Sequence, residues 1–226
     1  WNIKFGDNSV NENVSVEEDD YGIQKLNFKM DTTYKVSNFN FDGGAGNFNI
    51  SGTCEDLIMV STSGAKAILK QEVEDSTVNI DLDVSSVSIK IGKNSPNRFA
   101  KINLNPNVVW NLNLNAGAAN IDLDLSQYKV ETVNLDAGAI DLDMKLGNLY
   151  KNTTLNISTG ASNFEIEVPK ESGCVINTDI ALSERKFEGF KKIKPGMYVS
   201  DNLSNSSNII NINLDGGLSS FNIKRY

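Results

Sequence analysis

The chain has 226 residues and a formal net charge of -8, with 29 acidic and 21 basic side chains. Its lysines are scattered and arginine is scarce, so no basic stripe can neutralise phosphates, and nucleic acid is excluded as an expected partner. Histidine is absent, which removes the commonest general base and the commonest zinc ligand, and no apolar run approaches the ~18 residues that cross a bilayer.

The first 36 residues lack the pattern that fills the rest of the chain, and they carry an acidic run, EEDD, at 17–20. Because the end of a repetitive fold needs a polar cap, we expect an N-terminal extension or cap at 1–36 and a repeat domain at 37–226. The chain begins at Trp1 rather than at a methionine. We therefore expect a processed or trimmed product whose anchor or signal preceded Trp1.

From residue 37 onward, apolar and polar residues alternate, the alternation breaks at a small residue, and it resumes on the opposite parity. Segment 133–144, VNLDAGAIDLDM, is typical, and its relatives occupy 41–50, 114–125, 157–168 and 214–223. Strict alternation predicts strands, and a small-residue break predicts a corner at which the pleat slips. The predicted corner residues are Gly44, Gly117, Gly138, Gly160 and Gly217.

The central corner glycines recur with a period of about 21–22 residues, which is typical of one coil of a β-solenoid. We therefore predict an all-β parallel β-helix, right-handed by the crossover rule. The wider gaps would hold degenerate coils at Gly64-Ala65, at Ser85-Ser86 and at 174–182. An antiparallel sandwich is the rival fold, but the Asn-Gly and Asp-Gly turns that its hairpins would need are missing at most junctions. In a solenoid, the exposed terminal coils would allow oligomerisation through the ends.

One polar column is predicted four positions before each corner. Parity places these side chains on the outer face, where amides stacked at ~4.8 Å can hydrogen-bond along the column. We predict a structural ladder of Asn40, Asp81, Asn113, Asn134, Asn156 and Asn213.

A second feature, after the corner, is acidic. Alignment of the apolar pairs places Asp122, Asp141 and Glu165 in one outward column and Asp124, Asp143 and Glu167 in the next. Neighbouring like charges at this spacing repel by about 1 kcal/mol in water, and a hard cation such as Ca²⁺ would relieve that repulsion. The alternative is that the side chains splay apart and are screened by salt, since no EF-hand or nonapeptide ligand spacing is present.

Catalysis is the main functional alternative, because parallel β-helices also include enzymes that act on polysaccharides. Paired acids among Asp122, Asp124, Asp141 and Asp143 could stand at the ~5 to 10 Å that a glycosidase needs. A regular ladder, however, offers no apolar pocket that would keep one carboxyl protonated. The sequence also contains no GxSxG elbow and no P-loop, so we predict no catalytic residue and no cofactor other than Ca²⁺ at the acidic face.

We expect structural roles for the cysteines and for the tyrosines that lie outside the repeats. Cys54 and Cys174 are far apart and in no metal-ligand spacing, so we expect two buried free thiols. Tyr128, Tyr150 and Tyr198 fall between strands, where we expect them to cover coil edges rather than to form a shelf that stacks on sugars.

The repeats together resemble a known family. A G-A-G corner followed by NIDLDLS, the copies LDAGAIDLDM and STGASNFEIEVPKESGCVI, and the ending GMYVSDNLSNSSNIININLDGGLSSFNI are similar to the bacterial toast-rack family, over roughly 36–226. These domains are labelled adhesins and are similar to the C-terminal domain of LiaF-type cell-wall stress proteins. The resemblance implies a parallel β-helix, usually tethered at a bacterial membrane, with no catalytic residues to carry across.

Combined with the composition, the resemblance gives a functional expectation. We expect a non-enzymatic module of the cell envelope or of the extracellular surface, acting as an adhesin or as an envelope-stress scaffold. Its partner would be a protein or a cell-wall glycan, held by many weak contacts along a stiff rod. Tethering would come from a segment outside this sequence.

Overall fold

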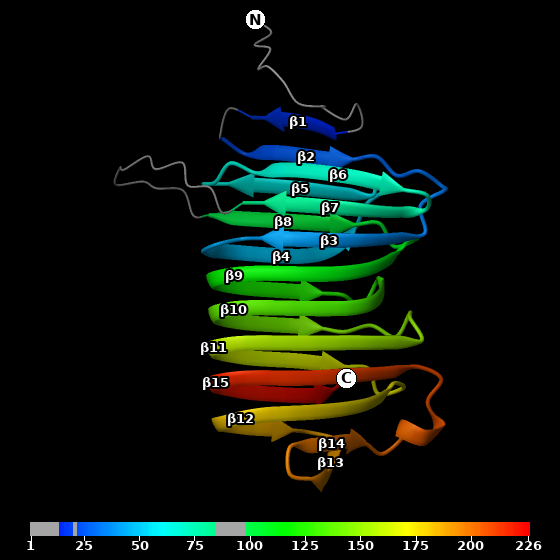
Figure 1. Cartoon of the computed structure of the whole chain (residues 1–226), viewed down its shortest axis with the longest axis vertical. Coiled ribbons are helices and arrows are strands. Elements are labelled where there is room, and N and C mark those ends of the chain that lie inside the picture. Colours follow the sequence, from blue (N-terminus) through cyan, green and yellow to red (C-terminus); the bar gives the residue numbers. More distant parts are fainter. Residues whose placement is uncertain (1–13, 20–21, 85–97) are drawn as a thin grey trace, which may run out of the picture.

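The computed structural model describes residues 14–19, 22–84 and 98–226, and it is an elongated all-β rod (Figure 1). The described part contains one short 3-10 helix, Leu203–Asn205, and no helix of the length and apolarity that a membrane span requires. The remaining elements are strands. They are β1 (Val14–Glu18), β2 (Gln24–Phe28), β3 (Val36–Asp42), β4 (Gly46–Thr53), β5 (Ile58–Ser63), β6 (Ile68–Glu74), β7 (Thr77–Asp83), β8 (Phe99–Leu104), β9 (Val109–Asp124), β10 (Lys129–Lys145), β11 (Asn152–Val168), β12 (Gly173–Phe187), β13 (Phe190–Lys194), β14 (Met197–Ser200) and β15 (Ile209–Arg225).

The long strands fold over at their corners, so the rod has two layers (Figure 1). Residues before the corner belong to layer A, which continues through β3, β7 and β6 at one end and β14 and β13 at the other. Residues after the corner belong to layer B, which continues through β4, β8, β5, β2 and β1. The layers enclose one apolar interior.

Neighbouring repeats pair in parallel and in register. Val133 of β10 lies between Leu112 of β9 and Leu155 of β11, and Leu155 lies beside Ile212 of β15. The all-β fold and the parallel stacking of the repeats are therefore confirmed, and the antiparallel sandwich is wrong for the middle of the rod. The corner lets apolar residues return to the interior after the bend, because the pleat slips there.

The order of strands in space differs from the order in sequence. β15 lies between β11 and β12, so the last strand of the chain is internal to the stack. Segment 174–182 lies in β12 and does stack in parallel, as predicted. Gly64-Ala65 is wrong as a degenerate coil, because it connects the antiparallel strand β5 to β6, and Ser85-Ser86 lies outside the described residues.

In the part of the chain that the structure describes, antiparallel strands finish both ends of the rod. β1, β2 and β5 pair in antiparallel fashion, and so do β12, β14 and β13. Such strands need only short connections, whereas another parallel strand would need a full crossover. The wide gaps in the period therefore hold hairpins at the ends of the rod.

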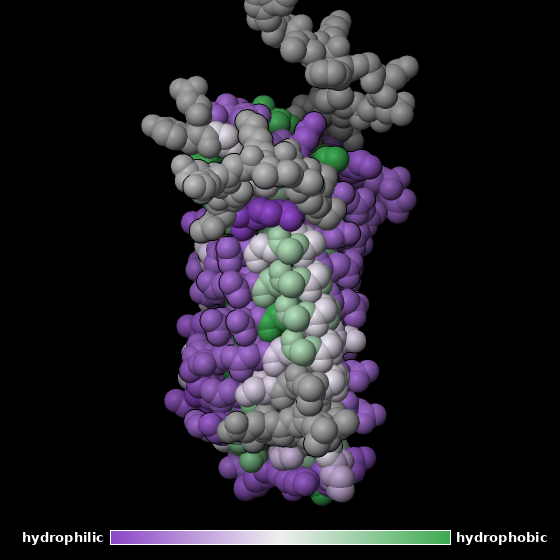
Figure 2. All heavy atoms as spheres, turned by 90° about the vertical axis from the view of Figure 1, so that its left-hand side faces the viewer, coloured by the Kyte–Doolittle hydropathy of each residue, from purple (hydrophilic) through white to green (hydrophobic). Residues whose placement is uncertain are grey.

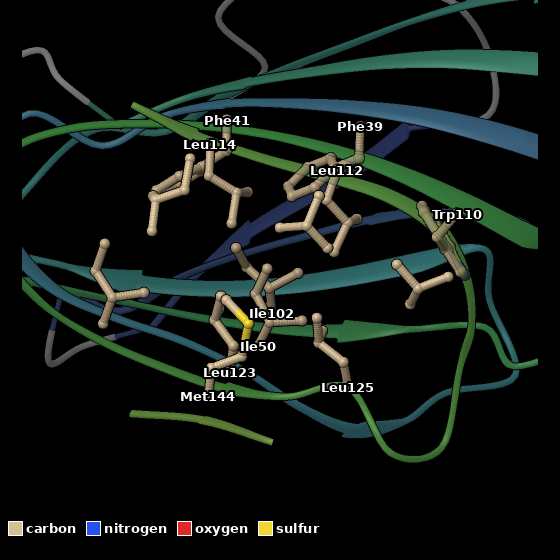
Figure 3. Packing of buried hydrophobic residues seen from close by; sticks show 14 of the residues in the cluster. Phe39, Phe41, Ile50, Ile102, Trp110, Leu112, Leu114, Leu123, Leu125 and Met144 are labelled. Carbon is tan, nitrogen blue, oxygen red and sulfur yellow. The ribbon is translucent and has the colours of Figure 1, made fainter. Parts of the chain in front are cut away.

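The interior is packed by the apolar half of each alternation (Figure 3). Trp110 is fully buried, and its indole N–H donates to the backbone carbonyl of Asn105 at 2.8 Å. Phe164 and Phe221, from the adjacent strands β11 and β15, stack with their ring centroids 4.8 Å apart. Facing aromatic rings of this kind add to the free energy of burial.

The three tyrosines close the edges of the coils, Tyr128 and Tyr150 from connections between strands and Tyr198 from within β14. The expectation that Tyr198 also falls between strands is therefore wrong. Tyr128 is buried, and its hydroxyl donates to the carbonyl of Gly52. Tyr150 donates to Glu131 at 3.1 Å, and Tyr198 packs edge-on against Phe187. Each tyrosine is occupied by a contact within the chain, in line with the predicted covering role.

Both cysteines are free, as predicted, but they differ in burial. Cys174 is fully buried, whereas Cys54 is half-buried and donates its thiol to the carbonyls of Asp56 and Asn103. Burial raises the pKa of each thiol to about 12. The neutral thiol is therefore the form that the fold favours.

We expect this pKa shift to make the fold sensitive to alkali. A thiol that titrates near pH 9 when unfolded and near pH 12 when folded stabilises the fold fully below pH 9, and that stability is lost as pH rises toward 12. Urea unfolding should show a loss of about 1 kcal/mol between pH 9 and 10 for Cys174 alone. Cys174→Ala should reduce that pH-dependent loss, and an unchanged loss would contradict this assignment.

Candidate functional site

A continuous ladder of amides runs along the outer face of layer A. Each asparagine donates its Nδ2 to the Oδ1 of the next residue toward the N-terminal end of the rod, at 2.8 to 3.0 Å. In spatial order the ladder is Asn177, Asn213, Asn156, Asn134, Asn113, Asn40 and Asp81. The predicted column is confirmed, and the structure adds Asn177 to it.

All the hydrogen bonds of the ladder point in one direction, and they end at Asp81, at the N-terminal end of the rod. Asp81 lacks an amide donor and accepts from Asn40 at 2.8 Å. Each amide uses one N–H and one oxygen lone pair within the ladder, which leaves a second donor and a second acceptor on each. The face is therefore ordered and still able to hydrogen-bond to a ligand.

This direction predicts unequal effects of two matched substitutions. Asn134→Asp removes the donor to Asn113 while keeping the acceptor for Asn156, so we expect the free energy of unfolding to fall by about 1 to 3 kcal/mol. Asp81→Asn keeps the acceptor that Asn40 needs, so a change below about 0.5 kcal/mol is expected. Urea unfolding at pH 7 measures both. Equal losses would show that the direction of the ladder is unimportant.

A second row on the same face, two positions before each corner, was not predicted. It consists mostly of carboxylates, and nearly all of its members are exposed. In spatial order the row is Asp83, Asp42, Asn115, Asp136, Ser158, Asp215 and Asp179. The same glycine frame that revealed the amides carries this signal, so sequence reasoning could have found it.

A groove of about 700 Å³ lies where the amide ladder and the acidic row pass beneath the turn between β13 and β14. Amides and carboxylates make its floor, and the segment from Lys194 to Met197 bounds it. The bounding turn is fixed, because Thr178 N–H donates to the Gly196 carbonyl at 2.7 Å. Gly196 has φ +76°, and a Cβ there would lie 2.6 Å from the Thr178 carbonyl oxygen, so only glycine fits.

The six carboxylates predicted as a calcium face lie on layer B, but not in the predicted columns. Asp143 lies between Asp122 and Glu165. Asp141 instead lies between Asn120 and Asn163, and Asp124 and Glu167 lie on either side of Lys145. The predicted pair of all-acidic columns is therefore wrong, and only Asp122, Asp143 and Glu165 form an unbroken acidic row.

The error comes from the corner. The prediction matched Ile121 with Ile140, whereas β9 and β10 stay in register through the glycines, which places Ala119 beside Ile140 and Ile121 beside Leu142. The two strands begin their apolar alternation at different distances from the glycine, and an alignment of apolar residues hides that difference.

Several of these carboxylates have partners within the chain. Lys224 pairs with Glu165 and, at 3.1 Å, with Glu167, and these contacts raise the pKa of Lys224. Asn49 donates to Asp122 at 2.8 Å, and Ser126 donates to Asp124 at 2.5 Å. Across the described residues, no group of three or more histidine, cysteine or acidic side chains is placed to hold a metal ion.

The corner glycines stack along one edge of the rod, where Figure 2 shows a pale stripe between two hydrophilic faces. The amide of Gly117 donates to the Gly44 carbonyl at 2.6 Å. A Cβ on Gly138, Gly160 or Gly217 would lie 2.7 to 2.8 Å from the carbonyl oxygen of the preceding glycine. Gly138, Gly160 and Gly217 are therefore glycine because the neighbouring backbone leaves no room for a side chain.

Comparison with known proteins bears on these features. Residues 4–167 match the family described as the N-terminal domain of toast_rack, DUF2154. The crystal structure of a candidate cell adhesion protein from Clostridium sporogenes superposes with a TM-score of 0.83 at 23% identity, covering 90% of this chain and 99% of that chain. A candidate adhesin from Bacteroides fragilis gives a TM-score of 0.26 at 11% identity, over 90% of this chain and 97% of the other. No curated protein matches the chain.

Proposed function

Because the chain belongs to the toast-rack family, we propose that it is a non-enzymatic module of a bacterial envelope or cell surface, an adhesin or scaffold that binds a partner along its polar faces. The groove above the amide ladder is the observation that carries this proposal. The fold shared with a structure named as a candidate cell adhesion protein is consistent with it. Tethering through a segment outside this sequence is part of the same proposal.

The groove favours a cell-wall glycan as the partner. Its amides offer both donors and acceptors, and its carboxylates accept from hydroxyl groups, so the floor matches the hydroxyl and amide groups of sugar polymers. The repeat of the floor along the rod also matches a repeating polymer. Many weak contacts would then add up along the chain.

Exposure of the carboxylates supports a binding role over hydrolysis. A glycosidase needs one carboxyl that stays protonated, which requires an apolar environment. Asp136, Asp179 and Asp215 of the groove are exposed, and so are Asp122, Asp141 and Asp143 of layer B. Among the side chains that the structure describes on either face, no carboxylate is buried.

The test is co-sedimentation of the protein with isolated, insoluble cell-wall glycan. We expect the wild type to sediment and Asp136→Lys/Asp215→Lys, in the groove, to lose at least about tenfold in affinity. The matched control is Asp141→Lys/Asp143→Lys on layer B, which makes the same charge change and should bind as the wild type does. Failure of the wild type to sediment would refute the glycan, and equal losses in both variants would refute the groove.

We further propose that residues 1–36 cap the rod and that 37–226 form the solenoid. Support comes from β1 and β2, which extend the end of layer B through pairing of β2 with β5. We also propose a right-handed solenoid with about 21–22 residues per coil, which the register of β9, β10 and β11 supports.

Calcium binding stays a prediction only for the unbroken acidic row of Asp122, Asp143 and Glu165, whose side chains are not gathered into a metal site in this structure. Asp143 is the middle charge of this row, so its removal should abolish any binding that depends on shared coordination. Calorimetry with millimolar Ca²⁺ should give heat in the wild type and none in Asp143→Asn. Absence of heat in the wild type would refute calcium binding. Screening by salt would then be what weakens the repulsion among these carboxylates.

A further inference from the structure

The two ends of the rod are stepped, because the layers end at different levels (Figure 1). At the N-terminal end, the described strands continue layer B beyond β4 through β8, β5, β2 and β1, and layer A beyond β3 through β7 and β6. At the other end, layer A continues beyond β12 through β14 and β13, whereas layer B ends at β12. Each end therefore has one layer that projects by two strands.

The two steps are complementary, because opposite layers project at the two ends. A second copy placed along the rod axis would bring its β6 beside β13 in layer A and its β1 beside the second half of β12 in layer B. Between β12 of one copy and the β3–β4 coil of the next, each layer would then contain four strands. Neither layer would have a gap or an extra strand.

Strand direction fits as well. β13 runs in the direction of β12, since each is antiparallel to β14, and β6 runs against the parallel strands, since it is antiparallel to β7. β1 also runs against the parallel strands, after three successive antiparallel pairings from β8. The β13–β6 pair and the β12–β1 pair between the two copies would therefore both be antiparallel. Edge strands form such pairs readily.

Charge is opposite at the two edges of layer A. β13 carries exposed Lys191, Lys192 and Lys194, and β6 carries exposed Glu72 and Glu74 with the single base Lys70. Lys191 has an exposed ion pair with Asp201 at 2.9 Å, and Lys192 lies over the Tyr198 ring. Such exposed contacts cost little to exchange for a partner's carboxylate.

Exposed apolar side chains also gather at these edges. Ile193 of β13 is 60% exposed, Ile68 and Val73 of β6 are 42% and 43% exposed, and Val16 of β1 is 57% exposed. Within the described residues, β6 pairs only with β7, β13 only with β14, and β1 only with β2. The free backbone edges, the apolar side chains and the opposite charges thus lie together.

We propose that copies of this chain join head to tail, with β13 of one copy pairing with β6 of the next and β12 pairing with β1. The joint extends both layers and produces a longer rod from identical units. This inference does not depend on the glycan partner. Lysines on an edge strand also serve in many proteins to prevent such pairing, and that role is the opposite outcome of the test.

The experiment measures mass in solution by light scattering after size-exclusion chromatography of the full chain. We expect the mass to rise with protein concentration at low salt and to fall toward one chain near 1 M salt, where the Debye length is about 3 Å. Charge reversal at one end, Lys191→Glu/Lys194→Glu, should leave single chains, and so should Glu72→Lys/Glu74→Lys. Lys151→Glu, on an exposed connection in the middle of the rod, is the control for a charge reversal away from the ends and should assemble as the wild type does.

Mixing the two end variants separates pairing from loss of folding. Each variant repels itself, but the acidic β13 of the first complements the basic β6 of the second, so the mixture should regain the higher mass. Circular dichroism confirms that each variant is folded. A wild type that stays at one chain mass at all concentrations, or a mixture that does not assemble, would overturn the proposal.

Discussion

Replacing Gly138 by valine is expected to lower the free energy of unfolding by about 3 kcal/mol or more, which would leave little folded protein. The first atom of any side chain there would lie 2.7 Å from the carbonyl oxygen of Gly117. That oxygen belongs to the backbone of the adjacent coil, so it cannot move aside as a flexible side chain would. The two coils would have to separate along their hydrogen-bonded register.

Urea unfolding followed by circular dichroism measures the effect, and the neighbouring alanine gives the control. Ala139→Val places the same final side chain one residue later, where a Cβ already exists and is exposed, so a loss below about 1 kcal/mol is expected. Comparable losses at Gly138 and Ala139 would show that β propensity or edge solvation, rather than close approach of the backbones, selects glycine at the corner.

The layered coil was predictable because its signals are local. Alternation with period two identifies strands, and a small residue that reverses the parity identifies a corner. The amide ladder follows from the same frame, since Asn113, Asn134 and Asn156 occupy one position relative to their glycines. The acidic row that contains Asp136 and Asp215 occupies another fixed position of the same frame, two residues before each glycine, so its signal is equally local.

The acidic columns of layer B were misplaced because apolar identity does not fix register across a corner. Ala119 and Ile140 pair, although one is small and the other large, and both are buried. The strands instead stay in register through the corner, with Ala116 beside Ala137 before the glycines and Ala118 beside Ala139 after them. A sequence shows which residues point inward, but not which of them lie side by side.

The groove could not be predicted, because it depends on the order of strands in space. Its floor comes from the coils, whereas its boundary comes from the turn at Gly196, which is held by Thr178. Nothing in the period indicates that β12, β13 and β14 close the rod while the chain returns to insert β15. The spatial order of these strands is set by pairing between residues far apart in the sequence, and such pairing leaves no periodic signal.

The position of β15 leads to the second large effect. Phe221 lies five residues from the last residue of the sequence, where fraying of the backbone and tolerance of substitutions are the usual expectation. In the structure it is 1% exposed and stacks on Phe164 with ring centroids 4.8 Å apart. Its strand also joins β11 to β12, so Phe221→Ala is expected to cost about 3 to 5 kcal/mol, as in the middle of a core.

Urea unfolding and native-state hydrogen exchange distinguish an internal strand from a frayed terminus. The backbone amides of β15 should be among the most protected in the wild type, because the strand pairs on both sides, with β11 and with β12. Leu149→Ala, at a side chain that is 52% exposed, is the control for loss of a large apolar residue and should change stability little.

A chain that ends at residue 208 should lose β12, β13 and β14 as folded elements, because β15 is the parallel partner that connects them to the rod. Weak protection of β15, or a truncated chain whose end remains folded, would show that the coils stack in the order of the sequence after all.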